Sequence, residues 1–509
     1  MALPPSEQPT AVEREDVARG AGMAALARLG AVIELIAQPI YTWLFGLATY
    51  GLYIVLWSAV NIAEKLVDLS LTEALQRLVP TLDEEAVHGT VKSAFLITVL
   101  PATVIALIVT LNAETIAGWL SASPEDAARL PLAIALFAWA LPLWTFVEIA
   151  TSAARARRAF GPEIRLRIFW EQLARLGFAG ALAGLGFTSL GLLIAHLASL
   201  LLVAILSLRI LARYYDFGLL VAAPLDARLI RTLVGSGLAL LPSAASRRTL
   251  NDLPPILLNL LLPGSSGAVA AGLFGIARKV ASVPLIVRQA FLYVLAPLSS
   301  AQNAQDRRRI APLYAFSARL SAALVVPIGA AIILLGSDIL SLFAPGAQAA
   351  LTMLVILVAG RIGEAVLGPA TPIVEMTGHR ILPLVNSVIG VGIWALLAWW
   401  LTPLYGPDGM AFAVSAGAVA IAVAAVVELY WSDRLHPFDT PFLRGLAIGL
   451  AGAAMLAGIG ELFAPLGAPP RAVAILAALP ALAWLSLRFG LAREDRAALG
   501  RAARIAKLS

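Results

Sequence analysis

The chain alternates long apolar stretches with short polar segments from one end to the other. A helix needs about 20 mostly apolar residues to cross the hydrocarbon core of a membrane, and we count fourteen such stretches in the 509 residues. They begin near residues 18, 45, 91, 131, 168, 190, 230, 267, 312, 347, 381, 408, 442 and 470. The pattern predicts an all-α, polytopic membrane protein of about fourteen transmembrane helices.

Composition supports the same fold class. Hydrophobic residues make up 60% of the chain and charged residues only 13%, whereas soluble domains carry about 25% charged residues. The mean hydropathy is +0.87. These values exclude an ordinary soluble domain.

Lys and Arg in the connecting segments indicate the orientation, because they accumulate on the cytoplasmic side of a membrane. Seventeen lie in loops on one side, and two, Arg129 and Arg471, lie in loops on the other. The first set is Arg77, Lys92, Arg155, Arg157, Arg158, Arg165, Arg167, Arg209, Arg213, Arg228, Arg231, Arg307, Arg308, Arg309, Arg380, Arg434 and Arg444. An even number of spans then places both termini in the cytoplasm, with tails at 1–17 and 490–509, in a bacterial cytoplasmic (inner) membrane.

The net charge, the absence of Cys and the small number of His exclude several classes of function. The net charge of +6 is mostly this orientation signal, so we expect no nucleic-acid partner. Residues 1–17 lack the apolar core of a signal peptide, and we expect the first helix to direct insertion. The chain has no Cys and four scattered His, which excludes thiol chemistry and offers no metal-binding spacing. We therefore expect no metal and no cofactor.

The two halves of the chain resemble each other. Tyr50-Gly51-Leu52-Tyr53 aligns with Ala271-Gly272-Leu273-Phe274 at an offset of 221, and Arg28 aligns with Arg248 at an offset of 220. Repeats are common in transporters, and an even number of helices in each repeat gives both the same orientation. We predict two six-helix lobes at 18–213 and 228–432, with two added helices at 442–489.

Several short motifs, in order along nearly the whole chain, carry a resemblance to a known family. They are Tyr50-Gly51-Leu52-Tyr53, Gln76-Arg77-Leu78-Val79-Pro80, Arg248 with Asp252, Gly272-Leu273-Phe274-Gly275-Ile276-Ala277-Arg278-Lys279, Ala296-Pro297-Leu298-Ser299 and Thr377-Gly378-His379. With these motifs the chain resembles the polysaccharide flippases of the multidrug/oligosaccharidyl-lipid/polysaccharide exporter superfamily. It departs from their pattern at Phe274, where a Tyr is more usual, and at Pro254-Pro255.

The resemblance implies two six-helix lobes around a central cavity that opens alternately to each side. It also implies a lipid-linked sugar as cargo.

Basic residues inside the apolar stretches are the candidate chemistry. A cation near the centre of a bilayer costs at least roughly 2.5–3.5 kcal/mol, so such residues normally face a bundle interior, a partner or a cavity. Ten lie there: Arg28, Lys65, Arg175, Arg247, Arg248, Arg278, Lys279, Arg288, Arg319 and Arg361. Arg offers a planar set of donors suited to phosphate. We therefore predict Arg28, Arg248 and Arg278 as ligands of a diphosphate, with Lys65, Lys279 and Arg361 as further members of a cationic cavity.

A structural interpretation competes for several of these residues. Arg248 and Asp252 are four residues apart and Arg361 and Glu364 are three apart, so each pair can form an ion pair within one helix. Lys65 has Glu64 and Asp68 beside it, and Arg175 follows Glu171 by four residues. Arg288 and Arg319 lie near cytoplasmic ends, where long side chains can reach the interface.

Carboxylates in the spans are candidates for coupling transport to protons or sodium ions. Burial raises the pKa of a carboxylate, whereas a neighbouring Arg lowers it. We select Glu34, Asp252 and Glu364, of which Glu34 has no base nearby in sequence.

The sequence thus predicts a flippase that translocates a polyprenyl-diphosphate-linked saccharide for surface polysaccharide synthesis (lipopolysaccharide, capsule or exopolysaccharide). Its expected partners are that saccharide, membrane lipids and the polysaccharide assembly machinery. A transporter of this kind would not be an enzyme. The alternatives are a peptidoglycan lipid-precursor flippase, a multidrug or cation antiporter of the same superfamily and, from another class, a membrane glycan polymerase or ligase. Short outer loops, roughly 4 to 20 residues, argue against the last.

Overall fold

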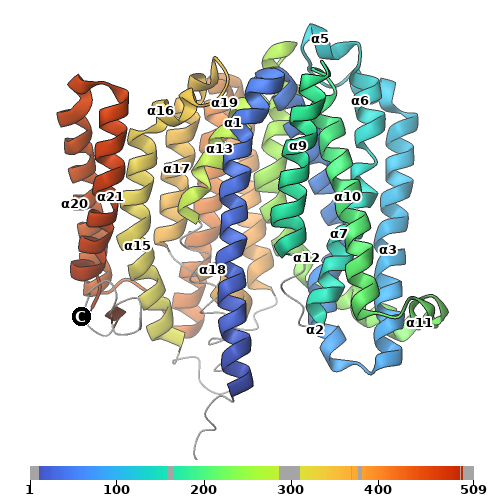
Figure 1. The fold of residues 1–509 in the computed structure, drawn as a ribbon. Helices are drawn as coiled ribbons and strands as arrows, with labels where there is room; N and C mark the ends of the chain where they lie inside the picture. Colours follow the sequence, from blue (N-terminus) through green and yellow to red (C-terminus); the bar gives the residue numbers. More distant parts are fainter. Residues whose placement is uncertain are drawn as a thin grey trace, which may run out of the picture. The chain divides into compact units, whose positions relative to one another are not determined.

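The computed structural model (Figure 1) describes residues 11–157, 164–285, 310–367, 370–376, 381–492 and 495–496, and of residues 11–32 it describes the backbone alone. Every regular element in these ranges is a helix. The motifs at 296–299 and 377–379, and Arg288, lie outside the described residues.

Eleven helices of the described part are long and apolar enough to cross a membrane. Two of them contain a break: α1 (Ala11–Asp68) at Gly46 and α19 (Leu382–Asp433) at Gly406, where φ is 80° and 57°. Only glycine adopts such positive φ angles without steric cost. Each break divides its helix into two spans. Together with the segment formed by η2 (Ile164–Trp170) and α9 (Glu171–Gly184), the described residues contain the fourteen predicted segments.

The contacts within the chain define two compact units. The first unit consists of Met1–Phe45, Ala63–Gly118 and Glu125–Leu240. Its helices, besides residues 11–45 and 63–68 of α1 and the start of α12 (Ala227–Leu261), are α2 (Leu71–Leu78), η1 (Val79–Thr81), α3 (Glu84–Leu111), α4 (Ala113–Ala117), α6 (Leu130–Phe137), α7 (Ala140–Ala156), η2, α9, α10 (Gly191–Tyr214) and α11 (Phe217–Ala222). The short α5 (Pro124–Ala127) falls on the boundary between the units.

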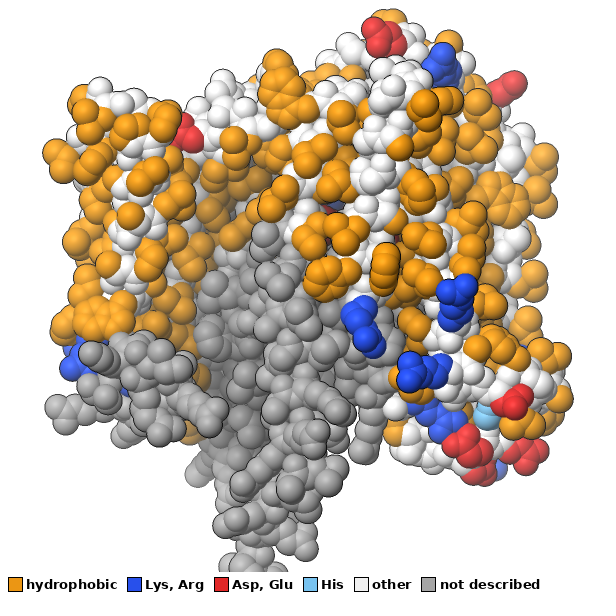
Figure 2. All heavy atoms as spheres, viewed as in Figure 1, with side chains coloured by type: hydrophobic (Ala, Val, Ile, Leu, Met, Phe, Trp, Pro, Cys, Tyr) orange, Lys and Arg blue, Asp and Glu red, His pale blue; other side chains and the backbone are white. Residues whose placement is uncertain are grey.

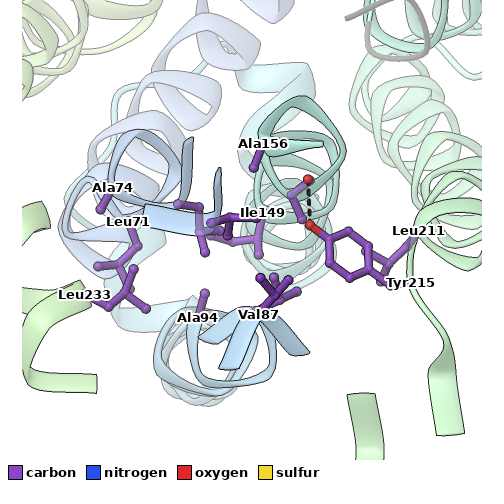
Figure 3. Packing of buried hydrophobic residues seen from close by; sticks show 13 residues of the cluster. Leu71, Ala74, Val87, Ala94, Ile149, Ala156, Leu211, Tyr215 and Leu233 are labelled. Atoms are coloured by element: carbon purple, nitrogen blue, oxygen red, sulfur yellow. Dashed lines mark hydrogen bonds between the residues drawn. The ribbon is translucent and has the colours of Figure 1, made fainter. Parts of the chain in front are cut away.

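Apolar side chains from separate helices form the core of the first unit. Leu71 of α2, Val87 of α3 and Ile149 of α7 are almost completely buried in one cluster (Figure 3). Tyr215, which follows α10, donates a hydrogen bond of 2.9 Å to the carbonyl of Ala153 beside this cluster. The buried hydroxyl group is therefore satisfied, as burial requires.

The second unit consists of Gly46–Ile62, Trp119–Pro124 and Leu241–Ser509. Its helices, besides residues 46–62 of α1, are α12 from residue 241 on, α13 (Ser265–Ala281), α15 (Ile310–Leu334), α16 (Gly336–Ser341), η4 (Ala347–Ala350), α17 (Leu351–Val366), α18 (Ala370–Met376), α19, α20 (Thr440–Phe463), η5 (Ala464–Leu466) and α21 (Ala468–Gly490). Leu335, Leu456 and Ile475 share one buried cluster, so the last two helices pack on the end of α15. The division into two six-helix lobes by sequence stays a prediction.

Two glycines that the repeat matches lie against each other in the second unit. A Cβ atom on Gly51 of α1 would lie 1.8 Å from the carbonyl oxygen of Ala268, and one on Gly272 of α13 would lie 3.1 Å from the Gly51 Cα atom. Small residues allow such close helix approaches in membranes. The contact joins two residues that the predicted repeat aligns, and the repeat itself stays a prediction.

The described surface is apolar over the spans and charged near their ends (Figure 2). Along α19, Trp399 is 84% exposed near the end of the first span and Trp431 is 74% exposed near the end of the second. Tryptophan favours the two membrane interfaces, and exposed apolar surface of this extent needs lipid contact. The chain is therefore a multi-pass membrane protein.

Candidate functional site

Asp252 on α12 is the centre of a polar cluster in the second unit. Its side chain is 5% exposed and accepts a hydrogen bond of 3.2 Å from Nη1 of Arg278 on α13. Nη1 of Arg248, one turn earlier on α12, lies 3.5 Å from its other oxygen. Of the two cations, Arg278 is the closer partner, and it comes from a different helix.

Asn251, the neighbour of Asp252, connects this ion pair to a third arginine. Its backbone carbonyl accepts a hydrogen bond from Nη1 of Arg278. Its side-chain oxygen accepts one of 3.2 Å from Nη2 of Arg361 on α17. Arg361 also pairs with Glu364 at 2.8 Å. Three helices thus contribute to one arginine cluster, defined here as Arg248, Arg278 and Arg361 with Asn251, Asp252 and Glu364.

The charges of the arginine cluster do not cancel. Within its six residues, three guanidinium groups and two carboxylates give a net charge of +1. The Arg248 and Arg278 side chains are 35% and 22% exposed, whereas that of Asp252 is nearly buried. Arg248 and Arg278 are therefore more accessible than the carboxylate that they share. Each guanidinium has five N–H donors, a chemistry that binds phosphate or another anion.

The structure brings together five of the predicted site residues, namely Arg248, Asp252, Arg278, Arg361 and Glu364. The two intrahelical ion pairs of the structural interpretation are present within the same cluster. Lys279 follows Arg278 on α13 and is half-buried. In the part of the chain that the structure describes, no group of three or more metal-binding side chains lies together.

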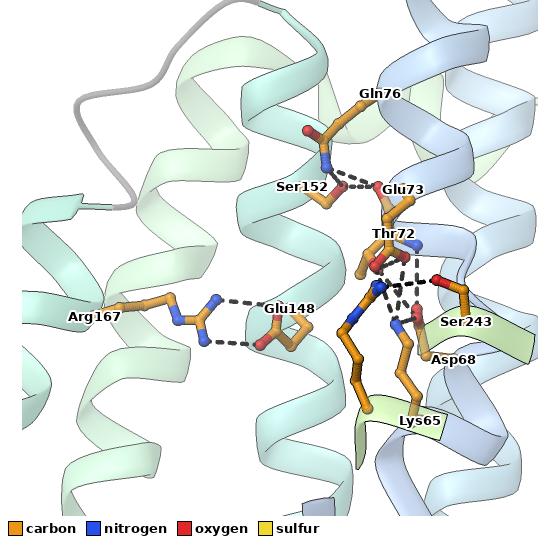
Figure 4. Close-up of polar contacts among 10 residues, drawn as sticks. Lys65, Asp68, Thr72, Glu73, Gln76, Glu148, Ser152, Arg167 and Ser243 are labelled. Carbon is orange, nitrogen blue, oxygen red and sulfur yellow. Dashed lines mark hydrogen bonds and ion pairs between the residues drawn. The ribbon is translucent and has the colours of Figure 1, made fainter. Parts of the chain in front are cut away.

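Lys65 belongs to the first unit and lies in an ionic network of its own (Figure 4). Its Nζ atom donates to Asp68 at 2.8 Å and to Glu73 at 3.3 Å. The Thr72 hydroxyl, which has one hydrogen to donate, lies within hydrogen-bond distance of the same two carboxylates, at 3.0 Å and 2.7 Å. The residues of the network lie on both sides of Leu69 and Ser70, which have positive φ angles and form the bend between α1 and α2. These contacts support the structural interpretation of Lys65, which fixes a strained bend.

Two further cations of the spans also have carboxylate partners. Arg175 pairs with Glu171 within α9, and both side chains are buried. Arg319 of α15 pairs with Asp439 and, at 2.8 Å, with Asp495. The pair at Arg175 is the one that the structural interpretation predicted. For Arg319 that interpretation was a side chain that reaches the interface, whereas the structure pairs it with two carboxylates.

Asp439 lies before α20, outside the spans, and its electrostatics follow from these contacts. Burial raises the pKa of its carboxyl group, but hydrogen bonds from Arg319 and from the backbone N–H of Phe442 outweigh burial and hold the pKa below its usual value.

Two predicted site residues, Glu34 and Arg28, lie on α1 before its break at Gly46. Glu34 of α1 is half-buried and lies near enough to Glu171 for their charges to interact. Arg28 lies within α1, but its side chain is outside the described residues.

Sequence reasoning missed two participants, Asn251 and Glu73. Glu73 is eight residues from Lys65, beyond a search for i, i+3 and i, i+4 partners, and meets it only because the chain bends at Leu69 and Ser70. The sequence does carry a signal for Asn251. Pro255, four residues later, has no N–H group to donate to its carbonyl.

Comparison with known protein families assigns the chain to one of them. The family described as polysaccharide biosynthesis protein matches residues 41–345, more than half of the chain. No curated protein sequence gives a significant match.

Solved structures give the fold. A structure of the lipid II flippase MurJ in an inward closed conformation has a TM-score of 0.73 at 11% identity, covering 92% of this chain and 98% of that chain. A variant of the MATE transporter VcmN from Vibrio cholerae has a TM-score of 0.60 at 13% identity, covering 81% and 96%. A MOP superfamily transporter from Pyrococcus furiosus has a TM-score of 0.54 at 14% identity, covering 82% and 95%. With the fold of these transporters, the chain belongs to the polysaccharide biosynthesis protein family.

Proposed function

We propose that the chain is an alternating-access flippase for a polyprenyl-diphosphate-linked saccharide, acting in the bacterial inner membrane with both termini in the cytoplasm. The observation that carries the proposal is the arginine cluster, which has an excess positive charge on membrane-spanning helices. The family match to polysaccharide biosynthesis proteins supports a surface glycan as the cargo. The resemblance to transporters supports transport rather than catalysis.

The cluster suggests how the cargo is held and released. In the absence of cargo, Asp252 and Glu364 neutralise part of the arginine charge. A diphosphate offers several acceptor oxygens and competes with these carboxylates for Arg278 and its neighbours. The lipid tail stays in the bilayer while the diphosphate-sugar head crosses. When the site opens to the other side, the carboxylates take back the guanidinium groups, which favours release.

We assign roles to three further residues that lie outside the arginine cluster. Arg28 of the first helix is a further diphosphate ligand, and Lys279 adds positive charge next to Arg278. Glu34, together with Asp252 and Glu364, is a candidate for coupling to a proton or sodium gradient, because a carboxylate in a span can exchange one cation for another.

Deletion of the gene in its host tests the function directly. Lipid-linked saccharides and surface polysaccharide are measured in the same culture, with a strain that carries the gene on a plasmid as the control. Accumulation of the lipid-linked intermediate together with loss of the surface glycan supports the proposal and identifies the cargo. Unchanged surface glycan with new sensitivity to cationic drugs refutes it and favours an antiporter.

A second candidate cargo is a peptidoglycan lipid precursor. The observation that favours it is the similarity to the lipid II flippase MurJ over 92% of the chain. The same deletion distinguishes the two, because accumulation of peptidoglycan precursors with cell lysis replaces the loss of a surface glycan.

A further inference from the structure

The carbonyl group of Asn251 lacks the usual donor of an α-helix. In an α-helix the N–H group of residue i+4 donates to the carbonyl of residue i, and residue 255 is a proline, which has no N–H group. Asn251 lies within α12, a helix that is long and apolar enough to cross a membrane. An unsatisfied carbonyl is costly there, and neighbouring helices commonly supply the missing donor.

Arg278 of α13 is the donor that satisfies this carbonyl. Its Nη1 atom donates to the Asn251 carbonyl and, at 3.2 Å, to the Asp252 carboxylate. Within the part of the chain that the structure describes, these are the hydrogen bonds of Arg278, and both use the same nitrogen. One edge of the guanidinium is thus anchored to α12, while Nη2 and Nε remain as donors for a ligand.

We propose that Pro255 is a positioning residue for the substrate: by leaving the Asn251 carbonyl without a helical donor, it fixes the guanidinium of Arg278 in the orientation that binds a diphosphate. This inference rests on the proposed function. An anchored side chain loses less conformational freedom when the ligand binds, so the ligand binds more tightly. Because the remaining donors of Arg278 are held in place, they favour a diphosphate, with its larger set of acceptors, over a monophosphate.

The neighbouring proline provides a matched control. Pro254 is buried on the same helix, as Pro255 is, and removes the helical donor of the Leu250 carbonyl. No side chain among the described residues donates to that carbonyl. Replacing either proline by Ala restores one N–H group and a better helix former. Only the replacement at 255 restores a donor that competes with Arg278.

The experiment measures binding of farnesyl diphosphate and farnesyl monophosphate to the purified full-length protein in detergent. The proteins are wild type, Pro255→Ala, Pro254→Ala and Arg278→Ala. We expect Pro255→Ala to weaken diphosphate binding about tenfold, the effect of one hydrogen bond to a charged group. The monophosphate should lose less, so the selectivity between the two probes falls. Pro254→Ala should keep the wild-type affinity and selectivity.

The outcomes distinguish the role of Arg278 as a diphosphate ligand from the role of Pro255 in positioning it. If Arg278→Ala binds the diphosphate as well as wild type does, the proposed site is wrong. If Arg278→Ala loses binding but Pro255→Ala keeps both affinity and selectivity, the site stands and the positioning role of Pro255 is overturned. Equal losses at 254 and 255 also overturn it, because they indicate a general effect on α12. Pro255→Ser, which restores the same N–H group, replaces Pro255→Ala if that variant is not monodisperse.

Discussion

Replacing Arg278 with Ala is the most direct test of the proposed cargo. A hydrogen bond that involves a charged group contributes about 1.5–3 kcal/mol, so two such bonds to a diphosphate contribute about 3 kcal/mol or more, roughly a 150-fold change in affinity. The loss should exceed this value, because Asp252 would lose its closer partner and its less compensated charge would repel the ligand. Arg278→Lys keeps the charge without the planar donors and should lose roughly tenfold.

The assay is complementation of the deletion strain, with lipid-linked saccharide and surface glycan measured at matched expression. Arg278→Ala should accumulate the intermediate and lose the glycan, and Arg278→Lys should fall between it and wild type. Arg209→Ala, which removes an exposed arginine of α10, is the matched control and should behave as wild type. Normal surface glycan in a strain whose only copy is Arg278→Ala would refute the reasoning.

Three further predictions concern the scaffold. Gly51→Ala should destabilise the protein by about 1–3 kcal/mol or more, because its Cβ atom would lie 1.8 Å from a backbone carbonyl of α13. The melting temperature in detergent checks this, with Gly177→Ala as the control, because a Cβ atom there meets nothing within 4 Å. Equal melting temperatures of the two variants would contradict the prediction. Because the pKa of Asp439 is lowered in the folded state, its pairing with Arg319 should stabilise the protein above the carboxyl group's usual pKa, about 3.9, and lose that effect as the pH falls through the lowered value. Asp439→Asn should melt at a lower temperature than wild type at pH 7, with a difference that shrinks towards pH 3; a constant difference would argue against the ion pair. Lys65→Ala should lower the melting temperature without changing the selectivity between diphosphate and monophosphate probes, since its charge is engaged by two carboxylates; a selective loss of diphosphate binding would assign Lys65 to the site instead.

The fold could be predicted from the sequence because the membrane imposes a simple rule. Each span must be apolar over about 20 residues and must satisfy its own backbone, so hydropathy alone located all fourteen segments. It could not show that Gly46 and Gly406 join neighbouring spans without a loop, since a positive φ angle leaves no trace in hydropathy.

The candidate site was only partly predictable, because its key pairings join different helices. A search for partners three or four residues away found Asp252 for Arg248 and Glu364 for Arg361. It left Arg278 without a carboxylate, whereas the structure gives it Asp252 from α12. Contacts between helices depend on how the helices pack, and one sequence shows packing only indirectly. The proline at 255 is such an indirect sign, since a backbone carbonyl without its own donor attracts one from elsewhere.

The ratio of carboxylates to arginines in the cluster bears on transport itself. Three unpaired arginines inside the membrane would cost at least roughly 8–10 kcal/mol, and they would bind a diphosphate so tightly that release became slow. Asp252 and Glu364 pair with the arginines, and in the proposed function they reduce both costs by stabilising the empty site and competing with the cargo. The one positive charge in excess still favours an anion over a cation. A transporter must release its substrate on the far side, so an incompletely neutralised cluster suits a flippase better than a site of arginines alone.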